Sequence, residues 1–195
     1  MDDFVLAFEL ETVMRPVANW MMRPLALVGL WLVMATAALA VDIAAFEGTY
    51  TGSAEIEGNE GAMVTRDMSV TISEQRKGFR VEWSTGTTRA DGTVKLKEYA
   101  IDFTPSERDD VYAAAMQRNV FGKEVPLDPM KGEPYVWARI LGETLTVYSL
   151  FVTSEGGYEI QQFDRTLSEG GLQLEFQNVR NGEIARRVST FLAAE

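Results

Sequence analysis

Apolar and polar residues alternate along much of the stretch 48–195, in short segments that are separated by glycine-containing turns. The segments 67–75 and 78–85 show the pattern most clearly, with an apolar side chain at every second position and a polar one between. A period of two with one apolar face is typical of a half-buried antiparallel strand. The pattern therefore predicts a protein built mainly of β-strands.

The segment 93–104 alternates too, but its apolar positions change phase. They begin with Val94 and Leu96 and then continue with Tyr99, Ile101 and Phe103. An extra residue in one strand turns the following side chains to the opposite face. We therefore expect a bulge or a bend near Glu98.

Turn signals separate the strand candidates in the second half of the chain. Asn181-Gly182 is a strong hairpin signal, because both residues tolerate a positive φ. Gly142-Glu143, Gly156-Gly157 and Gly170-Gly171 mark further turns. Nine candidate strands follow one another with almost no helical pattern between them, which predicts an up-and-down meander. The expected fold is all-β, an antiparallel meander that closes into a barrel of 8–10 strands.

The segment 104–134 interrupts this meander. Ser106 and Asp109 resemble a capping box, and 111–118 contains good helix formers, so we expect a short helix there. Three prolines follow, which predict an irregular and rigid loop. An insertion of this length between two strands indicates either a functional lid or a plug on one end of the barrel.

Residues 1–40 have the features of an export signal. Arg23 stands just before the run 24–40, in which no residue is charged. The run ends in the small-x-small pattern Ala38-Leu39-Ala40. It is shorter than the roughly 20 apolar residues that span a bilayer. We expect Sec-type cleavage near Ala40, which leaves one barrel domain over 41–195; an uncleaved N-terminal anchor is the alternative.

The first twenty residues fit a signal poorly, because they contain four acidic side chains where a signal is basic. Met14, Met21 and Met22 each offer a start that is followed by Arg15 or Arg23. We therefore expect translation to begin downstream of Met1.

The charge of the exported part restricts its partners. Four of the 29 acidic and two of the 18 basic residues lie in 1–40, which leaves 25 acidic and 16 basic residues and a net charge of −9. Such a surface repels phosphate backbones and anionic membranes. The chain has no cysteine, so it is not a bacterial lipoprotein, and it has no glycosylation sequon. The bacterial periplasm, or secretion beyond it, is the expected location.

The residue types present exclude several chemistries. Without histidine and cysteine, the chain lacks the commonest general base and the commonest ligands for zinc, and no nucleotide or nucleophile-elbow motif occurs. We expect no enzyme activity, no metal and no cofactor. Two groups of carboxylates leave acid–base chemistry as an alternative: Glu98 with Asp102, and Glu107 with Asp109 and Asp110.

The opening of the first strand resembles that of the calycins, the lipocalins and fatty-acid-binding proteins. In lipocalins a Gly-x-Trp closes the barrel floor and an arginine near the last strand packs across it; Gly48-Thr49-Tyr50 stands at the matching place, and Arg186 or Arg187 is in place of that arginine. The stretch 174–192 is similar to the closing hairpin of a fatty-acid-binding protein. The resemblance implies a barrel that holds a small ligand.

Arg186 shares a face with Ile184, Val188 and Leu192, so alternation points it inward. Three interpretations stay open. Arg186 pairs with a ligand carboxylate, or it stacks near Tyr50 at the floor, or the register is offset by one and Arg187 faces inward. The aromatic residues at strand spacing line a pocket or simply fill the core. The candidate pocket residues are Tyr50, Trp83, Tyr99, Trp137 and Arg186, with Tyr148 and Phe163 as further aromatic candidates.

Three functions are compatible with these features. The first is an exported soluble barrel that binds a small, largely apolar molecule. The second is an envelope interaction or structural module with a filled core, and the third is a small outer-membrane barrel. Pairs of polar residues that we expect on outward faces argue for water outside the barrel: Lys95/Lys97, Glu159/Gln161 and Gln173/Glu175/Gln177.

Overall fold

The computed structural model describes residues 42–57, 62–88, 92–114, 117–118, 124–125 and 127–195. The expected signal segment, its cleavage site and the alternative start residues therefore lie outside the described residues. The described elements, in chain order, are η1 (Ile43–Phe46), β1 (Gly48–Glu57), β2 (Met63–Gln75), β3 (Gly78–Thr88), β4 (Val94–Pro105), β5 (Val111–Ala114), β6 (Gln117–Arg118), β7 (Glu124–Val125), η2 (Pro129–Lys131), β8 (Tyr135–Leu141), β9 (Thr144–Val152), β10 (Tyr158–Ser168), β11 (Gly171–Arg180) and β12 (Glu183–Ala194), where η marks a 3-10 helix.

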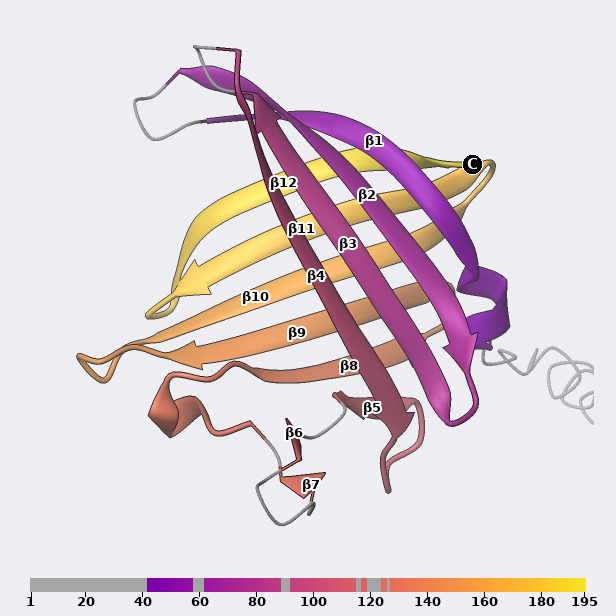
Figure 1. Ribbon diagram of the computed structural model, residues 1–195, viewed down its shortest axis with the longest axis vertical. Coiled ribbons are helices and arrows are strands. Elements are labelled where there is room, and N and C mark those ends of the chain that lie inside the picture. Colours follow the sequence, from indigo (N-terminus) through magenta and orange to yellow (C-terminus); the bar gives the residue numbers. More distant parts are fainter. Residues whose placement is uncertain (1–41, 58–61, 89–91, 115–116, 119–123, 126) are drawn as a thin grey trace, which may run out of the picture. The chain divides into compact units, whose positions relative to one another are not determined.

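Ten of these strands form a closed antiparallel barrel, in the order β1-β12-β11-β10-β9-β8-β5-β4-β3-β2. In Figure 1, strands β2, β3 and β4 cross in front of strands β8 to β12. Strands β6 and β7 pair only with each other. The sequence prediction of an all-β, antiparallel barrel of 8–10 strands is confirmed.

The first and last strands close the barrel. Strand β1 pairs with β12 where Tyr50 lies opposite Ala194 and Thr51 lies opposite Ala193. Thr190 Oγ1 also donates a hydrogen bond to the carbonyl oxygen of Ser53, at 2.7 Å. A Cβ atom at Gly52 would lie 2.5 Å from the carbonyl oxygen of Phe191. The two strands therefore approach so closely that only glycine fits at this position.

The barrel has two different ends, which we call the floor and the mouth. The floor holds η1 and the turns after β2, β4, β8 and β10, whereas strands β1, β3, β9 and β11 end at the mouth. In Figure 1 the floor helix η1 and the C-terminus lie at the right, and the turns that follow β9 and β11 lie at the left.

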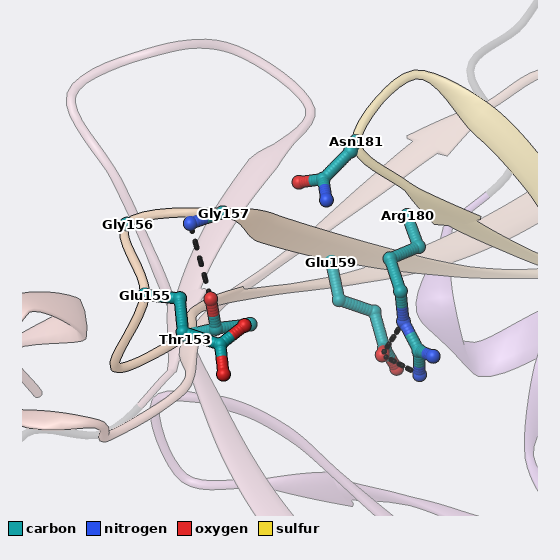
Figure 2. Close-up of a pocket in the computed structure, with 7 residues that line it drawn as sticks. All are labelled: Thr153, Glu155, Gly156, Gly157, Glu159, Arg180 and Asn181. Atoms are coloured by element: carbon teal, nitrogen blue, oxygen red, sulfur yellow. Dashed lines mark hydrogen bonds and ion pairs between the residues drawn. The ribbon is translucent and has the colours of Figure 1, made fainter.

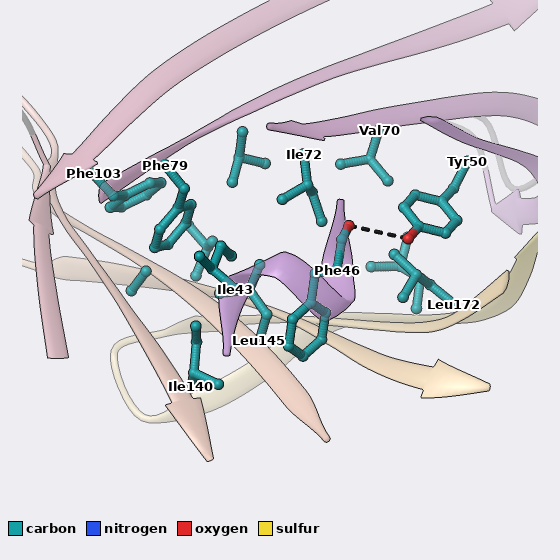
Figure 3. Close-up of a cluster of buried hydrophobic side chains, with 14 of the residues drawn as sticks. Ile43, Phe46, Tyr50, Val70, Ile72, Phe79, Phe103, Ile140, Leu145 and Leu172 are labelled. Atoms are coloured by element: carbon teal, nitrogen blue, oxygen red, sulfur yellow. Dashed lines mark hydrogen bonds between the residues drawn. The ribbon is translucent and has the colours of Figure 1, made fainter. Parts of the chain in front are cut away.

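A buried apolar cluster, the floor core, fills the floor half of the interior (Figure 3). The alternation of the strands places these side chains on one face, and η1 adds Ile43 and Phe46 from below. The Tyr50 hydroxyl donates to the carbonyl oxygen of Phe46 at 3.0 Å, which ties the first strand to η1. The floor core consists of Ile43, Phe46, Tyr50, Val70, Ile72, Phe79, Val81, Phe103, Val136, Ala138, Ile140, Leu145, Val147, Leu172, Leu174 and Leu192.

The helix predicted for 111–118 is wrong. Residues 111–114 form strand β5, which pairs with β4 on one side and β8 on the other and so completes the barrel wall. Ser106 caps no helix; its hydroxyl accepts a hydrogen bond from the Arg108 amide in a turn. The edges of β4 and β8 supply hydrogen-bond partners to the backbone of β5. These bonds outweigh the local helix propensity of the segment. The short helix of the insertion is η2 instead.

The bulge predicted near Glu98 is also wrong. Strand β4 pairs with β3 in unbroken register from Val94 to Phe103. Tyr99, Ile101 and Phe103 share the inner face with Lys97 and Lys95, whereas Val94 and Leu96 share the outer face and are exposed. The register shift observed in the barrel lies instead between Asn178 and Val179, where β11 meets β12.

Candidate functional site

The inner face of the barrel changes from the floor to the mouth. Above the floor core lies an aromatic layer, which consists of Trp83, Tyr99, Phe163 and Phe176. Above that layer the inner positions of most strands are polar or charged, as the register of β2, β3 and β4 shows for Arg66, Thr87 and Lys95. The interior therefore combines a filled apolar half with a polar half.

The aromatic layer spans the interior. The rings of Trp83 and Tyr99 stack at 5.2 Å between centroids, and those of Phe163 and Phe176 lie 4.7 Å apart. Trp83 on β3 also contacts Phe163 on β10, at 6.0 Å. These two strands are not neighbours in the sheet, so the contact crosses the barrel. Tyr99 is 48% exposed, which means that solvent reaches this ring of the layer.

Arg165 lies on the inner face directly below the aromatic layer. It stands opposite Leu145 and Leu174 in the neighbouring strands and is only 3% exposed. Its Cζ atom lies 5.6 Å from the centroid of the Phe163 ring. Its Nε and Nη1 atoms have no hydrogen-bond partner among the described residues.

Burial lowers the pKa of Arg165 to about 10, and the negative charge of Asp164 opposes this shift. At neutral pH the guanidinium is therefore still protonated. Asp164 does not pair with it, because this carboxylate accepts hydrogen bonds from Thr146 and Gln162 on the outer face. Arg165 thus carries a buried positive charge that no carboxylate of the described residues neutralises.

Four further cations lie on the inner face toward the mouth, and we call them the mouth cations: Arg66, Lys95, Lys97 and Arg186. Arg66 donates from Nε to Thr87 Oγ1 at 3.2 Å. Burial lowers the pKa of Arg66, and the positive charge of Arg186 lowers it further, so these two cations lie within electrostatic reach of each other. In the part of the chain that the structure describes, none of the four forms an ion pair.

The mouth also holds one neutralised pair, Glu159 and Arg180, beside a hollow of about 570 Å³ (Figure 2). Burial alone would raise the pKa of Glu159. Hydrogen bonds from Gln161, Arg180 and Asn178 outweigh that effect and hold its pKa below the ordinary value. The Glu159 carboxylate is thus occupied by its neighbours and does not compensate the mouth cations.

The turn after β9 forms the other wall of this hollow. The Gly157 amide donates to Thr153 Oγ1 at 3.0 Å, and the Tyr158 amide donates to Asn181 Oδ1 at 2.8 Å. The second bond joins the β9–β10 turn to the β11–β12 turn. The mouth is thus held in shape on this side by side chains that belong to its own turns.

The structure separates the five residues that the sequence singled out as a pocket. Trp83 and Tyr99 lie together in the aromatic layer. Tyr50 is buried in the floor core, where burial raises its pKa. Trp137 lies on the outer face, stacked on Tyr148 at 4.8 Å, because its neighbour Ala138 occupies the inner position.

Arg186 faces inward with Val188 and Leu192, as alternation predicts, but Ile184 does not share this face, because the register shifts between them. Arg186 also does not lie near Tyr50. Tyr50 pairs with Ala194, eight residues along β12 from Arg186, which is about 26 Å at the rise of a strand. The interpretation of an arginine stacked at the floor is therefore wrong. Arg187 faces outward and donates to Gln177 Oε1 at 3.2 Å, so the offset register is wrong too.

Sequence reasoning missed Arg165. The signal was present, since Phe163 and Leu167 are the inward residues on either side of it. Tyr158 and Ile160 in the same strand follow the opposite phase, however, and lie on the outer face, so the apolar pattern of this strand favours no single face.

The two groups of carboxylates lie on the outer face and in a floor turn. Glu98 and Asp102 share the outer face of β4, where Asp102 accepts from Arg80 at 2.9 Å. Glu107, Asp109 and Asp110 lie in the exposed floor turn after β4. Within the described ranges, no three acidic side chains come close enough together to hold a metal ion.

Comparison with known proteins gives no relative: no family model, curated protein or solved structure matches this chain. Among the described residues, none of the helices has the length and apolar character needed to cross a membrane.

Proposed function

We propose that this protein is an exported barrel that binds a small, largely apolar molecule in the mouth half of its interior. One observation carries the proposal: the aromatic layer lies inside the barrel, and one of its rings, that of Tyr99, remains open to solvent. Tyr99 is 48% exposed, whereas the floor core directly below contains fully buried residues such as Phe79 and Leu145. Stable cores bury their aromatic rings, so an open aromatic layer suits a ligand that completes it.

A relation to the calycins belongs to this proposal and has partial support. Tyr50 lies at the floor and bonds to η1, in the place that the lipocalin Gly-x-Trp occupies. The arginine of that pattern has no counterpart there, because Ala194 stands opposite Tyr50. The support thus comes from the closed barrel and from one half of the motif.

The outer face favours water over lipid as the surroundings of the barrel. Arg80 forms ion pairs on this face with Glu82 and Asp102, at 3.1 and 2.9 Å. Charged groups on a lipid-facing strand are destabilising. Of the polar pairs expected outside, Lys95/Lys97 and Glu159/Gln161 lie on the inner face, but Gln173, Glu175 and Gln177 do face outward.

Native mass spectrometry of protein isolated from its own host tests this proposal. We expect the wild type to carry an additional small mass that an organic solvent extracts. Trp83→Ala removes part of the aromatic layer and should lower the occupancy at least tenfold, whereas Trp137→Ala on the outer face should not. A wild-type protein without any bound molecule, or equal occupancy in the Trp83→Ala variant, would contradict the proposal.

One observation favours an interaction module as the second candidate. Tyr135, Trp137 and Tyr148 form an aromatic cluster on the outer face, with Tyr135 44% exposed. Aromatic side chains of this kind are enriched at protein interfaces. Cross-linking in intact cells separates the two functions, because a partner bound at this cluster is lost in Trp137→Ala and retained in Trp83→Ala.

A further inference from the structure

We propose that the bound molecule is an organic anion and that its negative group pairs with the Arg165 guanidinium. This inference rests on the proposed function, since it names the chemical class of the molecule that the barrel interior binds. It requires that the anionic end enters first and that the apolar body lies against the aromatic layer.

The unpaired state of Arg165 is the first reason. A buried guanidinium is destabilising unless it is paired or hydrogen-bonded. Within the described residues Nε and Nη1 have no hydrogen-bond partner, and the nearest carboxylate in sequence, Asp164, is held on the outer face. A ligand carboxylate accepts charge-assisted hydrogen bonds from guanidinium N–H groups, which suits these vacant donors. The ligand would thus supply the partner that the described chain lacks.

The position of Arg165 sets the orientation of the ligand. Leu172 on the floor side and Leu145 directly opposite Arg165 are fully buried, so the filled core leaves no room below. The aromatic layer lies immediately above, and the Phe163 ring lies over the guanidinium. An anion that reaches Arg165 therefore displaces this ring and leaves its apolar body beside Trp83 and Tyr99.

The distribution of charge is the second and independent reason. The whole chain has a net charge of −11, which repels anions from most of its surface. The mouth cations reverse that sign on the inner face. A cleft lined by one sign of charge attracts the opposite sign and raises the rate of encounter. These cations lie on the inner face between the mouth and the level of Arg165.

Titration calorimetry with decanoate and decan-1-ol tests the inference. The two probes share an apolar chain and differ in charge, and the protein is first stripped of any co-purified molecule. We expect decanoate to bind the wild type at least tenfold more tightly than decan-1-ol. In Arg165→Met the affinity for decanoate should fall at least tenfold while that for decan-1-ol is retained. Arg187→Met, which removes an arginine from the outer face, should change neither.

The outcomes distinguish this inference from the proposed function. Equal binding of both probes to the wild type would overturn the anion inference and leave the apolar binding site standing. Binding of neither probe would overturn both. The ratio of the decanoate and decan-1-ol affinities of the wild type tests the anion inference even where Arg165→Met fails to fold. Unchanged decanoate binding in a folded Arg165→Met protein would overturn the assignment of Arg165.

Discussion

The two halves of the barrel interior differ in polarity and in packing. In the floor half sixteen buried apolar side chains pack into one cluster, to which η1 adds Ile43 and Phe46. In the mouth half the inner face holds the exposed ring of Tyr99 and the mouth cations, which form no ion pair among the described residues. The difference indicates that the floor holds the fold together, whereas the mouth half is shaped for something that the chain itself does not supply.

The largest expected effect is in the floor. Leu145→Ala removes a fully buried side chain and leaves a cavity, so the free energy of unfolding should fall by about 2–5 kcal/mol. Tyr99→Ala in the aromatic layer is the matched comparison, and its effect should stay below about 1 kcal/mol because the ring is half exposed. Urea denaturation measures both values. Equal losses would remove the distinction between the two halves.

Substitution of Arg165, in contrast, should raise the free energy of unfolding. Arg165→Met replaces a buried charge that has no ionic partner among the described residues with an apolar side chain of similar length. Because replacing even a paired buried ionic group in this way is often neutral or stabilising by about 1–4 kcal/mol, we expect a gain in stability. We expect the ligand-free variant to have a higher midpoint of urea denaturation than the wild type, while Arg187→Met shifts it by less than about 0.5 kcal/mol. A marked loss of stability in Arg165→Met would show that the arginine serves the fold.

A smaller effect is expected where η1 joins the first strand. Tyr50→Phe keeps the ring in the floor core but removes the donor to the Phe46 carbonyl oxygen. The buried carbonyl then loses a partner, which should lower the free energy of unfolding by about 0.5–1.5 kcal/mol. Thr51→Val, at the adjacent outward position, is the control. Hydrogen exchange of the η1 amides should rise in Tyr50→Phe only.

The smallest effect concerns acid. The pKa of Glu159 is lower in the folded protein than in the unfolded chain, so its contribution is present above the unfolded value and disappears as the pH falls through the folded one. Glu159→Gln should therefore flatten the loss of stability between neutral pH and about pH 3, by less than about 1 kcal/mol. Glu175→Gln on the outer face is the control. Identical pH profiles for wild type and Glu159→Gln would refute this role.

Alternation predicted the strands well, and it assigned faces correctly in β2 and β3, where the inner face of the floor half is apolar. Met68, Val70 and Ile72 are examples, since their inward positions follow directly from the pattern. In β8, however, Trp137 lies outside although it was a pocket candidate, because Val136, Ala138 and Ile140 take the inner positions. The rule failed in β4 because the inner face becomes polar toward the mouth. Val94 and Leu96 lie outside there, and Lys95 and Lys97 lie inside. The change of phase in the apolar positions of β4 thus reflects an inner face that becomes polar toward the mouth, not an irregularity in the strand.

The remaining misses come from contacts between segments distant in sequence. The Ala-rich stretch after Val111 has helical propensity, but it lies between the free edges of β4 and β8, whose proximity only the closed barrel creates. Arg165 is a second case, because its lack of partners depends on three strands at once. Local patterns thus indicate that Arg165 faces inward, but they contain no information on its partners or on the edges that β5 joins.

The central claim is that the mouth half is an open chamber with positive potential. Quenching of Trp83 fluorescence tests it directly, in a protein with phenylalanine in place of Trp20, Trp31 and Trp137. We predict that iodide quenches Trp83 far more strongly than caesium does, because the mouth cations attract anions, and that decanoate protects the ring. A Trp83 that neither ion reaches, or that both quench equally, would contradict the claim.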